Sequence, residues 1–178
     1  RGPISVASGI KGGASNQSYG YFAGGYAGGS PGAITTVDRL DFSNDTTAAT
    51  AKGPLSVASY SLAGTGNNDY GYFGGGYYTS SISTVNRVDY SNDTETASVK
   101  GALSLTRQCL GATGNTSYGY FGGGFYDPSV YTSVVDRIDY SNDTPTAAAK
   151  GPLSVARQYV AATSSKSNAL PQTFLQGT

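Results

Sequence analysis

Acidic and basic side chains recur at fixed places in this 178-residue chain, and they are the first candidates for chemistry. In each of three copies an aspartate follows an arginine by two residues: Arg39 and Asp41, Arg87 and Asp89, Arg137 and Asp139. Two carboxylates can hydrolyse a glycosidic bond as acid and base. A catalytic pair is normally a singular feature, however, and these acids return in every copy. We therefore expect each aspartate to pair structurally with the arginine of its own copy.

Other common catalytic groupings are missing. The chain has no histidine and one cysteine, which excludes Ser-His-Asp and Cys-His arrangements. Cys109 has Ser61 and Tyr159 at the equivalent places of the other copies, so this position needs no thiol. We expect a packed side chain there rather than a nucleophile. The sequence predicts a protein that is not an enzyme and has no cofactor.

One segment deserves comparison with a calcium loop. Asp89–Asp93 has oxygen ligands at alternate positions, but an EF-hand also needs glycine at its sixth place and glutamate at its twelfth. Thr94 and Lys100 stand there instead. We favour a turn capped by Asn and Asp side chains, with a metal site as the alternative. The same Asn-Asp-Thr tripeptides fit the N-glycosylation sequon, although the turn accounts for them without modification.

These residues belong to a long internal repeat. An aromatic-glycine block occurs at Tyr19–Gly25, Tyr70–Gly76 and Tyr118–Gly124, at intervals of 51 and 48 residues. Such a period indicates one supersecondary unit copied in tandem. Six recurring glycines are expected to let neighbouring backbones approach closely: Gly24, Gly25, Gly75, Gly76, Gly123 and Gly124.

The sequence pattern predicts four short strands in each unit. In the second copy these are Tyr70–Gly75, Thr84–Tyr90, Thr94–Lys100 and the small-residue segment Arg107–Thr113, with a turn at residues 91–93. No helical period is present. We therefore predict an all-β protein of propeller-like blades, with the small-residue strand innermost because strands crowd around a central axis.

The repeats define the expected domain. Residues 1–165 are predicted to form three four-stranded blades at about 6–55, 58–103 and 106–153, plus an extra inner strand at 156–165. Residues 166–178 match no repeat. Three blades are fewer than the about four to eight that close a propeller. We expect the missing blades from a second copy, a longer polypeptide or another subunit; a small closed ring or a fibre of three intertwined chains are alternatives. Because the chain opens at Arg1 inside a repeat, we also expect a processed product or a piece of a longer protein.

The motifs resemble kelch repeats up to Ser165. Tyr72–Gly75, Asp89–Thr94 and Leu103–Arg107 stand where that family has hydrophobic residues before Gly-Gly, an aromatic-acidic turn, and an arginine before a small-residue strand. The resemblance implies a kelch-like β-propeller or propeller segment. The family's tryptophan after the turn is missing, and its arginine is present in two places only (Arg107 and Arg157, against Ser8 and Ser59). Copper oxidases of the kelch-like group need imidazole ligands, which this chain lacks.

The sequence segments GYFGGG, DRIDYSNDT and KGPLSVAR are also similar to segments of repeat proteins in virions of marine bacteriophages, especially cyanophages. This resemblance implies a non-enzymatic virion structural protein, or a tail- or fibre-associated protein that attaches to the host. Its location would be the extracellular virion. Its partners would be other copies of itself or other virion proteins.

The copies diverge after each glycine run, and we predict partner contacts there. The chosen residues are Tyr77, Tyr78, Phe125, Tyr126 and Tyr131. Loops on a rigid scaffold often carry recognition, and tyrosine with Ser and Gly makes an adaptable surface. Aromatic faces also suit sugars, so a secreted or cell-surface glycan-binding module is the alternative function. Packing between the loops would explain the same residues equally well.

Charge and hydrophobicity exclude two classes of partner. The chain has 11 basic and 11 acidic residues, and only 12% of it is charged, so electrostatics gives no reason to expect nucleic acid or an anionic membrane. No segment approaches the about 20 apolar residues of a membrane span. No secretory signal is evident.

Overall fold

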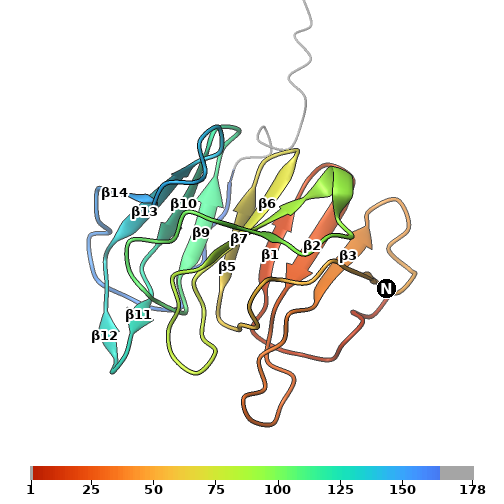
Figure 1. Ribbon diagram of the computed structural model, residues 1–178, viewed down its shortest axis with the longest axis horizontal. Helices are drawn as coiled ribbons and strands as arrows, with labels where there is room; N and C mark the ends of the chain where they lie inside the picture. The colour runs from red at the N-terminus through yellow and green to blue at the C-terminus, as the bar shows by residue number, and fades with distance from the viewer. Residues whose placement is uncertain (1, 165–178) are drawn as a thin grey trace, which may run out of the picture.

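The computed structural model describes residues 2–164 and consists almost entirely of antiparallel β-sheet (Figure 1), which confirms the predicted all-β class. The first sheet contains β1 (Gly12–Ser15), β2 (Tyr19–Ala23), β3 (Val37–Asp41) and β4 (Thr50–Lys52). The second contains β5 (Ala63–Gly66), β6 (Tyr70–Gly74), β7 (Val85–Asp89) and β8 (Ser98–Lys100). The third contains β9 (Gly111–Gly114), β10 (Tyr118–Gly122), β13 (Val135–Asp139) and β14 (Ala148–Lys150). A separate hairpin is formed by β11 (Phe125–Tyr126) and β12 (Val130–Tyr131), and the short 3-10 helix η1 spans Tyr90–Asn92. The predicted tail at 166–178 lies outside the described residues.

The three sheets have the same order and the same register. Strands pair in chain order, and the central pair always sets a tyrosine opposite an arginine, as in Tyr72 opposite Arg87. The first and third sheets repeat this with Tyr21 opposite Arg39 and Tyr120 opposite Arg137. The repeat in sequence is therefore a repeat in structure, down to individual cross-strand pairs.

The first strands of the sheets lie side by side. β5 lies between β1 and β9, so the three sheets meet along their small-residue strands (Figure 1). A Cβ atom on Gly64 would collide with the carbonyl oxygen of Gly13. Small side chains are therefore what allow this approach, as the sequence predicted.

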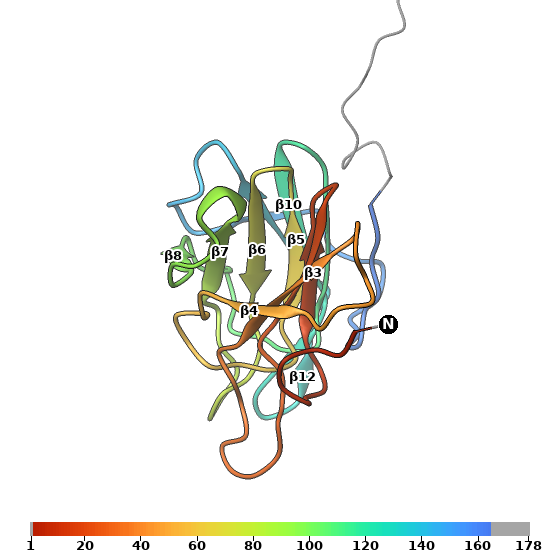
Figure 2. The ribbon, with the colours of Figure 1, turned by 90° about the vertical axis from the view of Figure 1, so that its right-hand side faces the viewer.

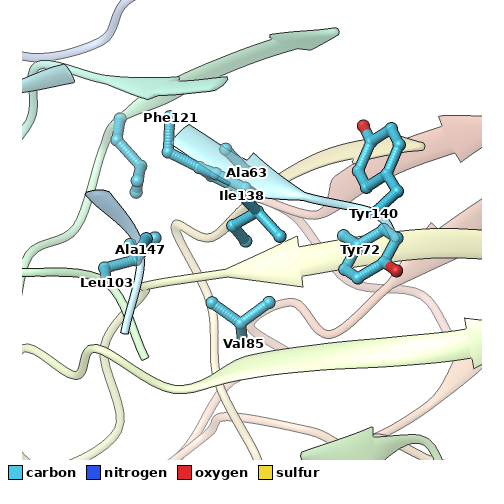
Figure 3. Close-up of a cluster of buried hydrophobic side chains, with 9 residues drawn as sticks. Ala63, Tyr72, Val85, Leu103, Phe121, Ile138, Tyr140 and Ala147 are labelled. Carbon is cyan, nitrogen blue, oxygen red and sulfur yellow. The ribbon is translucent and has the colours of Figure 1, made fainter. Parts of the chain in front are cut away.

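Two apolar clusters fill the spaces between successive sheets. Between the second and third sheets, Tyr72 and Val85 pack with Phe121 and Ile138 (Figure 3). An equivalent cluster between the first and second sheets contains Tyr21, Val37, Phe73 and Val88. Burial of such side chains is the main favourable contribution to folding. Each sheet therefore depends on its neighbour for its stability.

The paired glycines link one unit to the next. Gly75 and Gly76 have φ angles of +66° and +108°, which side-chain-bearing residues rarely adopt. Gly76 N donates to Arg107 O at 2.9 Å, and a Cβ on Gly75 would lie 2.6 Å from the same oxygen. Gly25 N and Gly124 N make equivalent bonds to Ser59 O and Arg157 O. The expected close approach of backbones is confirmed.

The inner strands begin later than predicted, and the extra one is not formed. Cys109 is buried, as expected, but its φ of +54° lies outside the β region, so β9 starts at Gly111 rather than at Arg107. Tyr159 has the same φ of +54° and donates its N–H to Cys109 O. Residues 156–164 form no strand, and residue 165 lies outside the described range. β1, β5 and β9 each pair with the strand that follows them in the chain, and among residues 2–164 no such strand follows residue 156.

A buried ion pair distinguishes the third sheet from the second. Arg107 and Asp136 are fully buried, and Arg107 Nη2 donates to Asp136 Oδ2 at 2.9 Å. The second sheet has Ser59 and Asn86 at these positions, and both are neutral. The two charges are therefore present together in one sheet and absent together in the other.

Replacing Arg107 by serine is expected to destabilise the protein by about 3–5 kcal/mol, because Asp136 would remain buried without its cation. The double variant Arg107→Ser/Asp136→Asn copies the neutral pair of the second sheet and should recover most of that loss. Urea unfolding measures both effects. A double variant no more stable than Arg107→Ser would contradict this account.

Candidate functional site

The three variable loops project from one end of the sheets. They follow the paired glycines and comprise residues 26–33, residues 77–81 and the β11–β12 hairpin. Figure 1 shows all three at the lower edge of the molecule, and Figure 2 shows the first loop and β12 still at that edge after the rotation. The sheets therefore present the most variable part of the repeat on a single surface.

A cluster of three tyrosines lies at the base of the first two loops. The rings of Tyr60 and Tyr77 are 5.5 Å apart, and those of Tyr26 and Tyr60 are 5.3 Å apart. Tyr77 also exchanges backbone hydrogen bonds with Tyr60. Burial, with a smaller effect of the neighbouring tyrosines, raises the pKa of Tyr60. Tyr77 therefore contributes to packing, and sequence reasoning missed Tyr60 because the other units have Gly9 and Gln108 there.

The third loop carries its own aromatic pair. The rings of Phe125 and Tyr131 lie 6.4 Å apart, edge to face. Tyr131 is 53% exposed and Tyr78 of the second loop is also exposed, whereas Tyr126 is half-buried. Tyr78 and Tyr131 are therefore the predicted residues most available to a partner.

Polar contacts join the second and third loops. Ser81 N donates to Asp127 Oδ2 at 3.0 Å, and Gln108 Nε2 donates to Ser81 Oγ at 3.4 Å. These bonds fix one loop relative to the other. The loops that carry the exposed side chains of Tyr78 and Tyr131 thus form a connected surface.

A groove lies at the opposite ends of the strands, between the second and third sheets. Its volume is about 400 Å³, and its lining includes Asn67, Asp69, Tyr70, Tyr118 and Asp139. Arg87 covers the ring of Tyr70 at 4.2 Å and Arg137 covers that of Tyr118 at 4.3 Å. One face of each ring is therefore already occupied. Sequence reasoning missed this groove because its residues come from two separate units.

The repeated aspartates do not pair with the arginines of their own copies, so that prediction is wrong. Asp89 Oδ1 instead accepts bonds from Ser91 N and Oγ, and its pKa is lowered chiefly by the Ser91 hydroxyl. Asp41 and Asp139 bind the equivalent serines, Ser43 and Ser141. The carboxylate lies two residues before its serine, a spacing that favours this local turn over the arginine. A low pKa also keeps these groups ionised, which does not suit a general acid.

The arginines reach across to the next sheet. Arg39 Nη1 donates to Asp93 Oδ2 at 2.8 Å, together with Tyr21 OH at 2.9 Å, while Lys52 Nζ lies 3.2 Å from Oδ1. Asp143 is bound in the same way: its Oδ2 accepts from Tyr72 OH and from Arg87 Nη1, both at 2.8 Å, and Lys100 Nζ lies 3.3 Å from its Oδ1. We call each such set of Tyr, Arg, Lys and Asp an inter-sheet latch. Arg137 forms no ion pair with an acid of the described residues and lies over Tyr118.

Stacked aromatic rings accompany each latch. Tyr21 stacks on Tyr90 at 4.5 Å, and Tyr72 stacks on Tyr140 at 4.8 Å. Figure 3 shows the second of these pairs face to face. Burial raises the pKa of Tyr140 to about 12. The latch thus combines charge, hydrogen bonds and aromatic packing at one point between two sheets.

The latch also bears on the calcium interpretation. Asp89 is bound by the serine of its turn, whereas Asp93 points to the first sheet. Their carboxylates thus serve different partners, which favours the turn. Within residues 2–164 no three His, Cys, Asp or Glu side chains gather closely enough to hold a metal ion. The same residues contain no helix long and apolar enough to cross a bilayer.

Comparison of the chain with models of known protein families gave no match, and comparison with curated proteins gave none either. The kelch-like and phage-like resemblances therefore rest on the repeat motifs.

Replacing Asp143 by asparagine is expected to cost about 1.5–3 kcal/mol, the usual contribution of hydrogen bonds to a charged group. Burial opposes ionisation of Asp143, but the Tyr72 hydrogen bond and the Arg87 and Lys100 charges outweigh it, so its pKa is lowered. A lowered folded-state pKa stabilises the protein above the unfolded value of about 3.9, and this contribution is lost as the pH falls further.

Urea unfolding between neutral pH and pH values below about 4 measures this effect. The wild-type protein should lose more stability on acidification than Asp143→Asn does. Asp69→Asn makes the same chemical change at an exposed residue outside the latch and is the control. An acid-induced loss of equal size in wild type and Asp143→Asn would contradict the prediction.

Proposed function

We propose that this chain is a kelch-like β-propeller segment that serves as a non-enzymatic structural or tail- or fibre-associated attachment protein of a bacteriophage virion. The observation that carries the proposal is the connected loop surface, which exposes Tyr78 and Tyr131 at one end of a rigid stack of sheets. The phage part of the proposal is supported by the repeat motifs, which are similar to those of repeat proteins in marine phage virions.

The arrangement of the sheets supports the propeller part of the proposal. Three four-stranded antiparallel sheets share one strand order, and their first strands lie side by side. Propeller blades are four-stranded sheets arranged radially with their inner strands around a channel. Small residues line the space beside these strands, among them Gly13, Gly64 and Thr113.

Recognition suits the site better than catalysis. The recurring acids are bound either to the serines of their turns or to the latches, so their charges are already neutralised or hydrogen-bonded. The loop surface offers tyrosine rings and hydroxyls instead. Tyrosine provides large contact area at low conformational-entropy cost, as binding surfaces require.

A glycan-binding module is the second candidate, and the groove between the second and third sheets favours it. Asn67 and Asp69 provide polar groups beside the Tyr70 and Tyr118 rings. The arginines over these rings leave less aromatic surface for a sugar to stack on. For this reason we prefer attachment through the loops to glycan binding in the groove as the proposed function.

The double variant Tyr78→Ser/Tyr131→Ser is expected to weaken binding of labelled protein to marine cyanobacterial cells at least about tenfold, as for hot-spot aromatic residues. Val99→Ser changes a side chain that is 60% exposed on β8, away from the loops, and should bind normally. Mass spectrometry of purified cyanophage particles should detect the chain.

Unchanged cell binding by the double variant, or absence of the chain from the particles, would oppose the attachment role. Glycan-array binding that Asp69→Asn weakens and Tyr78→Ser/Tyr131→Ser leaves intact would instead support the glycan-binding module.

A further inference from the structure

The third sheet carries an incomplete latch on its outer face. Its residues occupy the register positions that the cations and the tyrosine of the complete latch hold in the second sheet: Tyr120, Arg137 and Lys150. Within residues 2–164 no acid forms an ion pair with Arg137 or Lys150. Tyr120 is half-buried, and in the same part of the chain its hydroxyl makes no hydrogen bond. This face therefore offers two cations and a hydroxyl to a carboxylate.

An apolar seat beside this incomplete latch also lacks its side chain. Between the second and third sheets, Phe121 lies in the buried cluster of Figure 3, and a Cβ on Gly74 would be 2.9 Å from its ring. Gly122 is the equivalent of Gly74, but a Cβ there would meet only Val135 and Leu153 of its own unit, at 3.5 and 3.8 Å. Both of these side chains are half-buried, whereas their equivalents in the second sheet are buried. The seat over Gly122 therefore has room for a phenylalanine from a further unit.

An unpaired backbone edge lies next to the same face. Residues 162–164 line the space that β1, β5 and β9 also line, and Thr113 Oγ1 donates to Thr163 O at 2.7 Å. They thus occupy the place of a fourth inner strand. Residues 161–164 are all exposed, and within residues 2–164 their backbone N–H groups donate to no carbonyl oxygen. An extended strand can add to such an edge through main-chain hydrogen bonds.

We infer that the outer face of the third sheet, together with residues 161–164, binds three strands of another polypeptide that complete a fourth sheet. The first of these strands pairs with residues 161–164 and places a phenylalanine over Gly122. The turn after the second strand places an aspartate beside Arg137 and Lys150 and an aromatic ring on Tyr120. Equivalent contacts join the second sheet to the third within the chain. The inference rests on the propeller-segment part of the proposed function and not on attachment to a host.

The acidic turns of this chain are already engaged, so a second copy is not the occupant. The turns with Asp93 and Asp143 complete the latches of the first and second sheets. The turn at residues 44–47 contacts Gly2, whose N–H donates to a carbonyl oxygen of that turn at 2.9 Å. Residues 165–178 contain no Asp, Glu or Tyr and cannot complete the latch. The charges and the apolar seat instead fit a different polypeptide with a Tyr-Phe-Gly strand and an aspartate turn.

A synthetic peptide with the sequence of residues 117–155 tests the inference, because it contains β10, β13 and β14 but no inner strand of its own. The full chain should bind this peptide. Arg137→Gln in the chain or Asp143→Asn in the peptide should each raise the Kd at least about tenfold. Together they should weaken binding little more than either does alone, because both remove the same contact. Val99→Gln, at a residue 60% exposed on β8, is the control and should leave the Kd unchanged. Isothermal titration calorimetry measures each Kd.

An extended chain provides a second measurement that does not depend on the solubility of the peptide. A copy of residues 115–164 is inserted after Ser164, so that residues 161–164 are followed by the strands that follow β9 in the third unit. The amides of residues 161–164 should then exchange with deuterium more slowly than in the natural chain. Asp143→Asn in the added copy alone should lower the urea midpoint of the extended chain.

Three results would overturn the inference. These are failure of the soluble peptide to bind, equal binding of the peptide and its Asp143→Asn form, and exchange at residues 161–164 that is as fast in the extended chain as in the natural one. Self-association of the chain that excludes the peptide would show that a second copy is the occupant. Tyr78→Ser/Tyr131→Ser chains should bind the peptide normally, so failure of the attachment role is distinguishable from failure of this contact.

Discussion

A carboxylate held between two sheets is the interaction on which this structure depends. Asp93 and Asp143 each take a tyrosine hydroxyl, an arginine and a lysine from the preceding sheet. Partly buried charges are stabilising only when their hydrogen bonds are complete and well oriented. The latch therefore fixes the relative position of two sheets, and the apolar clusters then fill the space that this position defines.

The latch also explains why the variable loops and the groove lie where they do. β6 begins at Tyr70, beside the groove, and ends at Gly74, where the chain enters the second variable loop. Its middle residue, Tyr72, belongs to the latch. The interactions that hold the sheets together thus occupy the middle of the strands, and both ends remain for loops whose sequences differ between units.

The sequence predicted what repeats locally and failed where a residue serves another unit. The two central strands of each sheet, the turn at Ser91 and the close approach of Gly75 follow from short-range patterns and were predicted, whereas the inner strands begin later than predicted. Asp93 was assigned to a turn alone, because nothing local shows that its side chain reaches 54 residues back to Arg39. The groove and the Tyr60 cluster were missed for the same reason: their members come from different units. Positive φ at Cys109, a non-glycine residue, also carried no sequence signal.

The second unit gives its acid, Asp93, to the first unit and its cations, Arg87 and Lys100, to the third. Adding or removing one entire unit would recreate the same contact at the new junction, whereas a change of a few residues inside β2 or β3 would shift Tyr21 or Arg39 out of reach of Asp93. Duplication and deletion in such genes should therefore be tolerated in steps of a whole repeat, near the 51- and 48-residue intervals of this chain. Evolution can vary the number of sheets without redesigning any junction.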